Sequence, residues 1–123
     1  MSKSVLLIGL KSSAVNFEKW PELTSEKLEN AFASILSDLT EAGFHASWCL
    51  TESDASLASQ QVSNQLKKQS PDIVVIGAGV RKDPDHLLMF EQILNIVMSE
   101  APGCKLAFNT LPFDTVDAVK RWT

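Results

Sequence analysis

Cysteine is scarce in this sequence of 123 residues, which contains two: Cys49 and Cys104. They lie in separate segments and lack the CxxC spacing of metal and redox motifs, so we expect two free thiols, as in a cytoplasmic protein. Long apolar runs are also missing. Residues 5–10 form the run nearest the N-terminus, and six residues are too few for a signal peptide or for a membrane span of about 20 residues. We therefore expect a cytoplasmic protein without a membrane partner.

Basic residues are few as well. Eleven Lys and Arg stand against fifteen Asp and Glu, which gives a net charge of −4. This balance argues against nucleic acid or an anionic membrane surface as the main partner. Hydrophobic residues at 45% and charged residues at 21% are near the averages of globular proteins, which argues against disordered and collagen-like classes. The length suits one core, so we expect a single α/β domain over residues 1–123.

Four segments have the patterns of strands in a parallel sheet. Residues 5–10 and 73–77 are short apolar runs rich in branched side chains, as expected of strands that are covered on both faces. Residues 44–50 alternate large apolar with small or polar side chains and predict an edge strand. Residues 105–108 predict a short fourth strand.

Helical patterns alternate with these strands. Apolar residues recur on one helical face between Leu28 and Leu39, with Thr24 or Ser25 as a cap and Gly43 at the end. Further helices are predicted over residues 54–68, over residues 84–100 with Asp83 as the cap, and after Asp114 as the cap of the last helix. Leu57 should face inward from the first of these helices and Trp122 from the last. With right-handed crossovers, this order predicts a three-layer α/β sandwich. Its four-stranded parallel sheet has the order 2-1-3-4, as in flavodoxin-like and Rossmann-like folds.

In such sheets, ligands bind beyond the carboxyl ends of the strands, where the strand order reverses. Loops that follow the first, third and fourth strands should meet there. Paired glycines let a ligand approach the backbone, and Lys and Arg supply positive charge. The predicted ligand-binding residues are Lys11, Ser12, Gly77, Gly79, Arg81, Asn109 and Thr110. In the alternative interpretation, the glycines only turn the chain, the cations are solvated, and Asn109 and Thr110 satisfy a turn and cap the last helix.

Familiar cofactor motifs are absent or incomplete. Residues 77–82 lack the third glycine of the dinucleotide motif and follow the third strand instead of the first, and the GxxxxGK[ST] pattern of a P-loop is missing. Residues 11–14 have the hydroxyls of a flavodoxin phosphate loop but no glycine, and the strand ends lack the acidic cluster of a receiver domain. The sequence therefore supports no site for NAD, FMN, ATP or a metal ion.

Three further features leave alternatives open. His86 is the one candidate for proton transfer at this edge, or else a partly buried side chain at a helix start, so whether the protein is an enzyme stays open. In the long loop at residues 10–23, Trp20 either covers a ligand or anchors the loop against the body of the domain. Helix 84–100 carries more apolar side chains than one buried face needs, which predicts a homodimer through this helix. In the alternative interpretation, the far edge of the fourth strand and the last helix cover the excess.

Several segments spread along the chain carry a resemblance to a known family. They are residues 5–10, 48–50, 74–81, 86–88 with 90–91, 101–103, 108–110 and 114–122. Together they resemble an uncharacterised family of small stand-alone bacterial proteins with related fungal chains. The resemblance implies a flavodoxin-like or Rossmann-like fold and brings no activity, ligand or catalytic residue.

Two main hypotheses about function follow from the sequence. In the first, the domain binds a small anionic or polar metabolite at the carboxyl edge of the sheet, with catalysis left open. In the second, it is a non-enzymatic interaction or dimerisation module, with a receiver-like fold that lacks phosphoacceptor chemistry and works through helix 84–100. A flavin or nicotinamide protein is a third alternative.

Overall fold

Four strands form one sheet in the order β2-β1-β3-β4. They are β1 (Ser4–Leu10), β2 (His45–Thr51), β3 (Ile73–Ile76) and β4 (Lys105–Ala107). The computed structural model describes residues 3–110 and 112–123, and each neighbouring pair of strands in it is parallel. The predicted α/β fold, with its parallel sheet in the order 2-1-3-4 and its flavodoxin-like topology, is confirmed.

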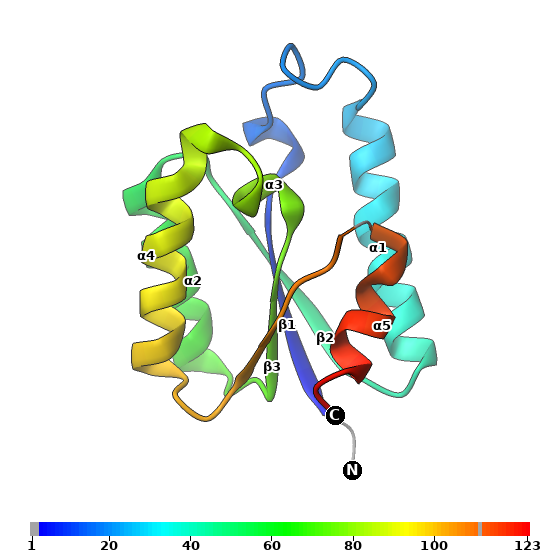
Figure 1. The fold of residues 1–123 in the computed structure, drawn as a ribbon, viewed down its shortest axis with the longest axis vertical. Coiled ribbons are helices and arrows are strands. Elements are labelled where there is room, and N and C mark those ends of the chain that lie inside the picture. The colour runs from blue at the N-terminus through cyan, green and yellow to red at the C-terminus, as the bar shows by residue number, and fades with distance from the viewer. Residues whose placement is uncertain (1–2, 111) are drawn as a thin grey trace.

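Helices cover both faces of the sheet, as Figure 1 shows. One face carries α1 (Ser25–Glu41) and α5 (Thr115–Lys120), and the other carries α2 (Ala55–Lys68) and α4 (Leu87–Glu100). The predicted three-layer arrangement is therefore confirmed. The longest helix of the described residues has 17 residues, fewer than the roughly 20 that a bilayer requires, and none is a candidate membrane span.

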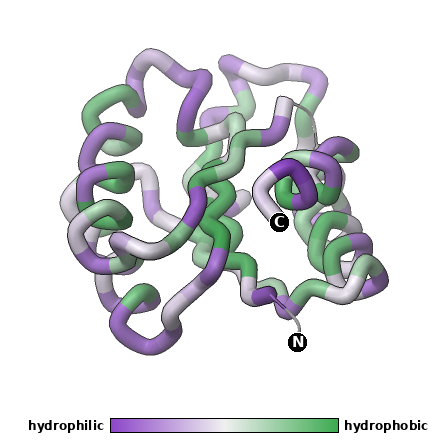
Figure 2. Tube along the Cα trace, turned by 60° about the horizontal axis from the view of Figure 1, so that its bottom comes forward, coloured by the Kyte–Doolittle hydropathy of each residue, from purple (hydrophilic) through white to green (hydrophobic). Residues whose placement is uncertain are grey.

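The strand β1 is buried on both of its faces. Leu6 and Ile8 pack with the helices α2 and α4, whereas Val5 and Leu7 pack with α1 and α5. The two groups separate because successive side chains of a strand point to opposite faces of the sheet. Figure 2 shows the consequence: the central strands are mostly hydrophobic, and hydrophilic turns of the helices surround them.

The helix α1 begins and ends at the predicted signals. The hydroxyl of Thr24 accepts a hydrogen bond from the backbone N–H of Lys27 at 3.1 Å, which satisfies one of the free amides of the first turn. Gly43 follows the helix with φ of +93°, a conformation that glycine adopts without strain. The chain can then turn directly into β2.

Some local predictions are wrong. Leu57 is 51% exposed, because the buried stripe of α2 follows Ala58 at intervals of four residues and Leu57 lies one residue off it. Trp122 is 52% exposed, because α5 ends before it, at Lys120. Residues 78–81, predicted as loop, form the short helix α3 (Ala78–Arg81). Helix 84–100 starts with a 3₁₀ turn, Pro84–His86, and becomes α-helical at Leu87.

Both cysteines are free, as predicted. Cys49 is buried on β2, and Cys104 is half-buried just before β4. Burial raises the pKa of each thiol, so both favour the neutral form at neutral pH.

Candidate ligand-binding cavity

A cavity of about 280 Å³ lies at the carboxyl edge of the sheet, beside the ends of β1 and β3. Its volume is near the lower end of the roughly 300–1,000 Å³ of small-molecule sites. Most of its walls are apolar side chains from the first βα loop, β1, α1, β2 and α3: Leu10, Val15, Trp20, Leu23, Leu28, Ala31, Phe32, Ile35, Trp48 and Ala78. The remaining walls are glycines and a small set of polar residues: Gly9, Gly77, Gly79, Asn16, Lys82, Asp83, His86 and Asn109.

Aromatic side chains form one wall. The indole N–H of Trp48 donates to the backbone oxygen of Phe32 at 3.0 Å, and the two ring centroids are 4.6 Å apart. A Cβ atom at Gly9 would lie 3.0 Å from Cζ3 of Trp48, so the glycine is what leaves room for the indole beside β1. Because the only donor of the indole is already bonded, Trp48 offers ring surface alone to the cavity.

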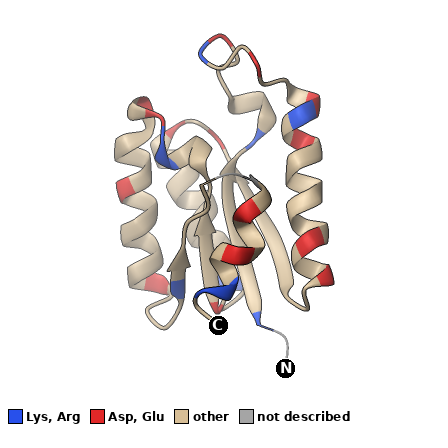
Figure 3. Cartoon of the chain, turned by 45° about the vertical axis from the view of Figure 1, so that its right-hand side comes forward, with Lys and Arg blue, Asp and Glu red and all other residues tan. Residues whose placement is uncertain are grey.

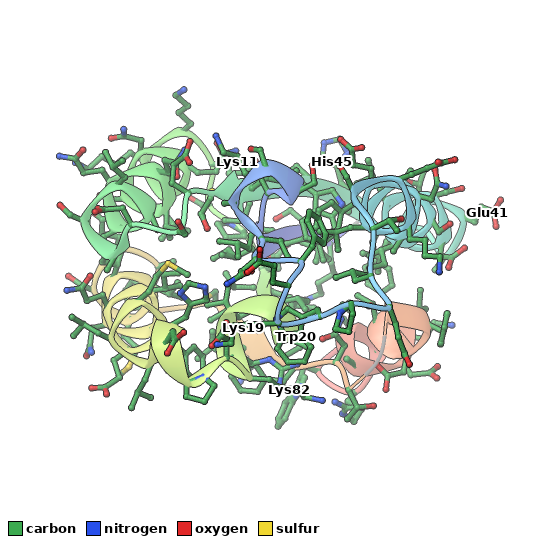
Figure 4. The ribbon with its side chains drawn as sticks, turned by 90° about the horizontal axis from the view of Figure 1, so that it is seen from above. Lys11, Lys19, Trp20, Glu41, His45 and Lys82 are labelled. Carbon is green, nitrogen blue, oxygen red and sulfur yellow. The ribbon has the colours of Figure 1, made fainter. Side chains whose placement is uncertain are left out.

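The first βα loop forms another wall and is held in place by an ion pair. Nζ of Lys19 lies 2.7 Å from Oδ1 of Asp83 and 2.9 Å from Oδ2 of Asp85, which follows on the same turn. The neighbouring residue, Trp20, lines the cavity and is 45% exposed. Figure 4, which looks onto this edge, shows Lys19 and Trp20 next to each other above the centre of the fold, with Lys82 close by. The pair therefore fastens the loop to the start of α4.

Each partner of this ion pair shifts the pKa of the other so that the charged form is favoured. The hydrogen bond from Lys19 lowers the pKa of the nearly buried Asp83 carboxyl below its usual range, and the backbone N–H of Asp85 adds to the effect. In turn, the bonds to Asp83 and Asp85 raise the pKa of Lys19. Both partners are charged at neutral pH.

Four of the residues predicted for ligand binding or proton transfer line the cavity: Gly77, Gly79, His86 and Asn109. A Cβ atom at Gly79 would meet nothing within 4 Å, so this residue borders open space. Nε2 of His86 lies 3.8 Å from Oδ2 of Asp83. The side-chain amide of Asn109 is engaged elsewhere, because its oxygen accepts from Arg81 at 3.0 Å and its nitrogen donates to Thr115 at 2.9 Å. Whether these residues bind a ligand stays a prediction.

Three other predicted residues lie outside the cavity lining and are paired with acids. Lys11 donates to Glu52, the hydroxyl of Ser12 lies 3.3 Å from Oε1 of Glu29, and Thr110 donates through both its hydroxyl and its backbone N–H to Asp114. In Figure 4, Lys11 lies apart from Lys19, Trp20 and Lys82. Figure 3 marks acidic and basic residues along several of the same helices and loops.

The side chain of Arg81 contacts the ends of two neighbouring strands. Its Nε donates to the backbone oxygen of Ile76 at 2.7 Å, and its Nη2 donates to both the backbone and the side-chain oxygen of Asn109. The guanidinium carbon lies 5.3 Å from the ring centroid of Phe108. Partial burial lowers the pKa of Arg81, but the group stays charged. Arg81 thus joins the end of β3 to the end of β4, and it is not part of the cavity lining.

Some cavity residues were not anticipated from the sequence as parts of a site. The sequence pattern predicts Trp48 only as part of a strand and Phe32 only as part of a helix face, and it gives no indication for Lys19. A glycine inside the apolar run of β1 is a signal for Trp48, since such a glycine often marks a close approach of another group. For Lys19, no local signal exists, because its partners lie more than 60 residues further along the chain.

Comparison with models of known protein families gives no match, and comparison with curated proteins gives none that is significant. Within residues 3–110 and 112–123, no group of three His, Cys, Asp or Glu side chains could hold a metal ion. The chain is thus shown to be a small α/β protein with a four-stranded parallel sheet of order 2-1-3-4. The family resemblance stays a prediction.

Proposed function

We propose that this protein binds a small organic molecule in the cavity at the carboxyl edge of its sheet. The observation that carries the proposal is the cavity itself, with mostly apolar walls and a few polar groups, beside the strands where the sheet order reverses. Such an arrangement is typical of small-molecule sites in open α/β folds. The volume suits a molecule of one or two rings better than a dinucleotide.

The proposal modifies the interpretation from the sequence. Lys11 and Arg81, which were expected to attract an anion, are engaged with Glu52 and with the backbone of β3 and β4. The polar side chains at the cavity are instead Asn16, Lys82, Asp83, His86 and Asn109. Burial of apolar ligand surface therefore supplies most of the affinity, and the polar groups orient the ligand.

A substitution at Gly79 tests the proposal. A side chain at this position points into open space and φ is not positive, so Gly79→Leu should fold and occupy part of the cavity. Gly103→Leu is a matched control, because a Cβ atom there also meets nothing within 4 Å and Gly103 does not line the cavity. Thermal unfolding is measured with a panel of aromatic acids, nucleosides, sugar phosphates and flavins.

A ligand at a hundred times its dissociation constant should add about 2.7 kcal/mol to the stability, which raises the unfolding midpoint by several degrees. We expect this shift in the wild type and in Gly103→Leu, and its loss in Gly79→Leu. A panel without any effect on the wild type, or an equal shift in Gly79→Leu, contradicts the proposal. If the bound molecule is also transformed, His86 is the residue to test for proton transfer, because its imidazole lines the cavity.

A second candidate function rests on the outer surface of α4. Leu87, Leu88 and Met98 are 57%, 63% and 64% exposed, and Leu87 and Met98 lie on the same side of the helix at this spacing. An apolar surface of this kind suits a homodimer through α4. Phe90 and Leu94 are half-buried against the core, so they do not test this idea. Light scattering of wild type and Leu87→Lys/Met98→Lys should show a dimer and a monomer, respectively, and a monomeric wild type at high concentration would exclude it.

A further inference from the structure

We infer that the ligand of the cavity is a flat ring system carrying one carboxylate, an inference that rests on the proposed function. Two separate observations lead to it. The first is the aromatic wall formed by Trp48 and Phe32, and the second is the pairing of the charged side chains around the cavity.

The aromatic wall favours a ring over an aliphatic chain. The indole of Trp48 is fixed by its hydrogen bond to Phe32 and by the ring contact at 4.6 Å, so its surface is in place before a ligand arrives. Trp20 contributes a second indole from the first βα loop. A flat ring gains stacked or edge-to-face contacts with such surfaces in addition to the burial of apolar area.

The pairing of the cations indicates a single negative charge. Lys11 is paired with Glu52, and Lys19 is paired with Asp83 and Asp85. Lys82 lines the cavity and forms no ion pair within the described residues, and its Nζ donates to the backbone oxygen of Thr110 at 3.4 Å. One ammonium group that lacks an ion pair matches one carboxylate. A phosphate group, with up to two charges and three strong acceptor oxygens, needs more donors than this wall offers.

The same pairing disfavours a cationic ligand. Asp83 is the one acidic side chain among the residues that line the cavity, and Lys19 already donates to it at 2.7 Å. An amine would have to displace this lysine and release the first βα loop. A neutral ring would gain no charge-assisted hydrogen bond from Lys82.

The test uses three probes that share one ring system: 2-naphthoate, 2-naphthamide and 2-naphthyl phosphate. Binding is followed through the indole ¹⁵N–¹H signals of the three tryptophans. We expect 2-naphthoate to shift the signals of Trp20 and Trp48 and to leave Trp122 unchanged, because Trp122 does not line the cavity. Its affinity should exceed that of the amide and of the phosphate by about tenfold, the effect of one charge-assisted hydrogen bond.

Two lysine variants complete the design. Lys82→Met should lower the affinity for 2-naphthoate about tenfold, to the level of the amide. Lys105→Met is the control, since Lys105 is exposed at the start of β4, away from the cavity, and its loss should change nothing. Equal affinities of acid and amide, tighter binding of the phosphate, or no effect of Lys82→Met overturns the inference. Failure of all three probes to shift Trp20 or Trp48 also overturns it, while the broader ligand panel with Gly79→Leu decides the proposed function separately.

Discussion

Replacement of Arg81 by alanine should destabilise the fold, because its guanidinium joins the end of β3 to the segment that follows β4. Three hydrogen bonds are lost: one to the backbone oxygen of Ile76, and two to the oxygens of Asn109. The contact of the guanidinium with the ring of Phe108, at 5.3 Å, is lost as well. The oxygen atoms left behind belong to the buried residues Ile76 and Asn109, where water replaces the donor only in part.

The magnitude follows from these contacts. Each fully buried hydrogen bond to a charged group contributes about 1.5–3 kcal/mol, and a partly exposed cation–π contact contributes about 0.5–1 kcal/mol. Because Arg81 is half-buried and solvent compensates part of the loss, we expect the free energy of unfolding to fall by about 2–3 kcal/mol. For a chain of this length, that change lowers the thermal midpoint by about 10 °C.

Urea unfolding of wild type and Arg81→Ala, followed by circular dichroism, measures the difference. The slope against urea should stay constant while the midpoint falls, because the surface exposed on unfolding is unchanged. Arg121→Ala is the control: Arg121 also donates to a backbone oxygen, that of Phe108 at 3.1 Å, but it is exposed and should lose at most about 1 kcal/mol. An Arg81→Ala protein as stable as the wild type would refute the structural role and return Arg81 to the candidates for ligand binding.

Three further predictions concern the first βα loop and the aromatic wall. Lys19→Met should release the loop and raise hydrogen exchange of residues 15–20 several-fold, and unchanged exchange would contradict the fastening by Asp83. The ion pair of Lys19 and Asp83 should stabilise the fold fully between about pH 4 and pH 10. Folding lowers the pKa of Asp83, so this stabilisation is lost as Asp83 becomes protonated at more acid pH. Folding raises the pKa of Lys19, so it is also lost as Lys19 becomes neutral at more alkaline pH. The difference in thermal midpoint between wild type and Lys19→Met, measured against pH, should therefore disappear at both extremes, and a constant difference would argue against it. Gly9→Val should displace Trp48, cost about 1–3 kcal/mol in urea unfolding and reduce ligand affinity, whereas a variant of unchanged stability would show that the contact at 3.0 Å is not restrictive.

The fold could be predicted because its signals are local. The runs at residues 5–10 and 73–77 indicate strands covered on both faces, and a helix between them forces a parallel, right-handed connection. The helix α1 has its cap at Thr24 and its end at Gly43 within a few residues of its apolar stripe. Errors arose at Leu57 and Trp122, where hydrophobic character alone does not decide which side of a helix faces the core.

The candidate site could be predicted only as a location. The rule that ligands bind at the carboxyl edge of a parallel sheet indicates the loops that follow β1, β3 and β4, and Gly77 and Gly79 from one of these loops line the cavity. The roles of the cations could not be predicted, because each depends on a partner from a distant segment: Arg81 on Asn109, and Lys19 on Asp83. The sequence shows which residues are cationic, but it does not show which carboxylate or carbonyl group lies beside each of them.

By itself, the sequence determined the order of strands and helices, the strands that lie at the centre, and the edge at which loops converge. These depend on apolar periodicity, on chirality and on turn residues, all of which act over a few neighbouring positions. Only the tertiary structure decided that Trp48 extends beside Gly9, that a cavity remains next to it, and that Lys82 is the cation that lines it without an ion pair in the described part of the chain. Such contacts form between segments tens of residues apart, so they exist only once the sheet has brought those segments together.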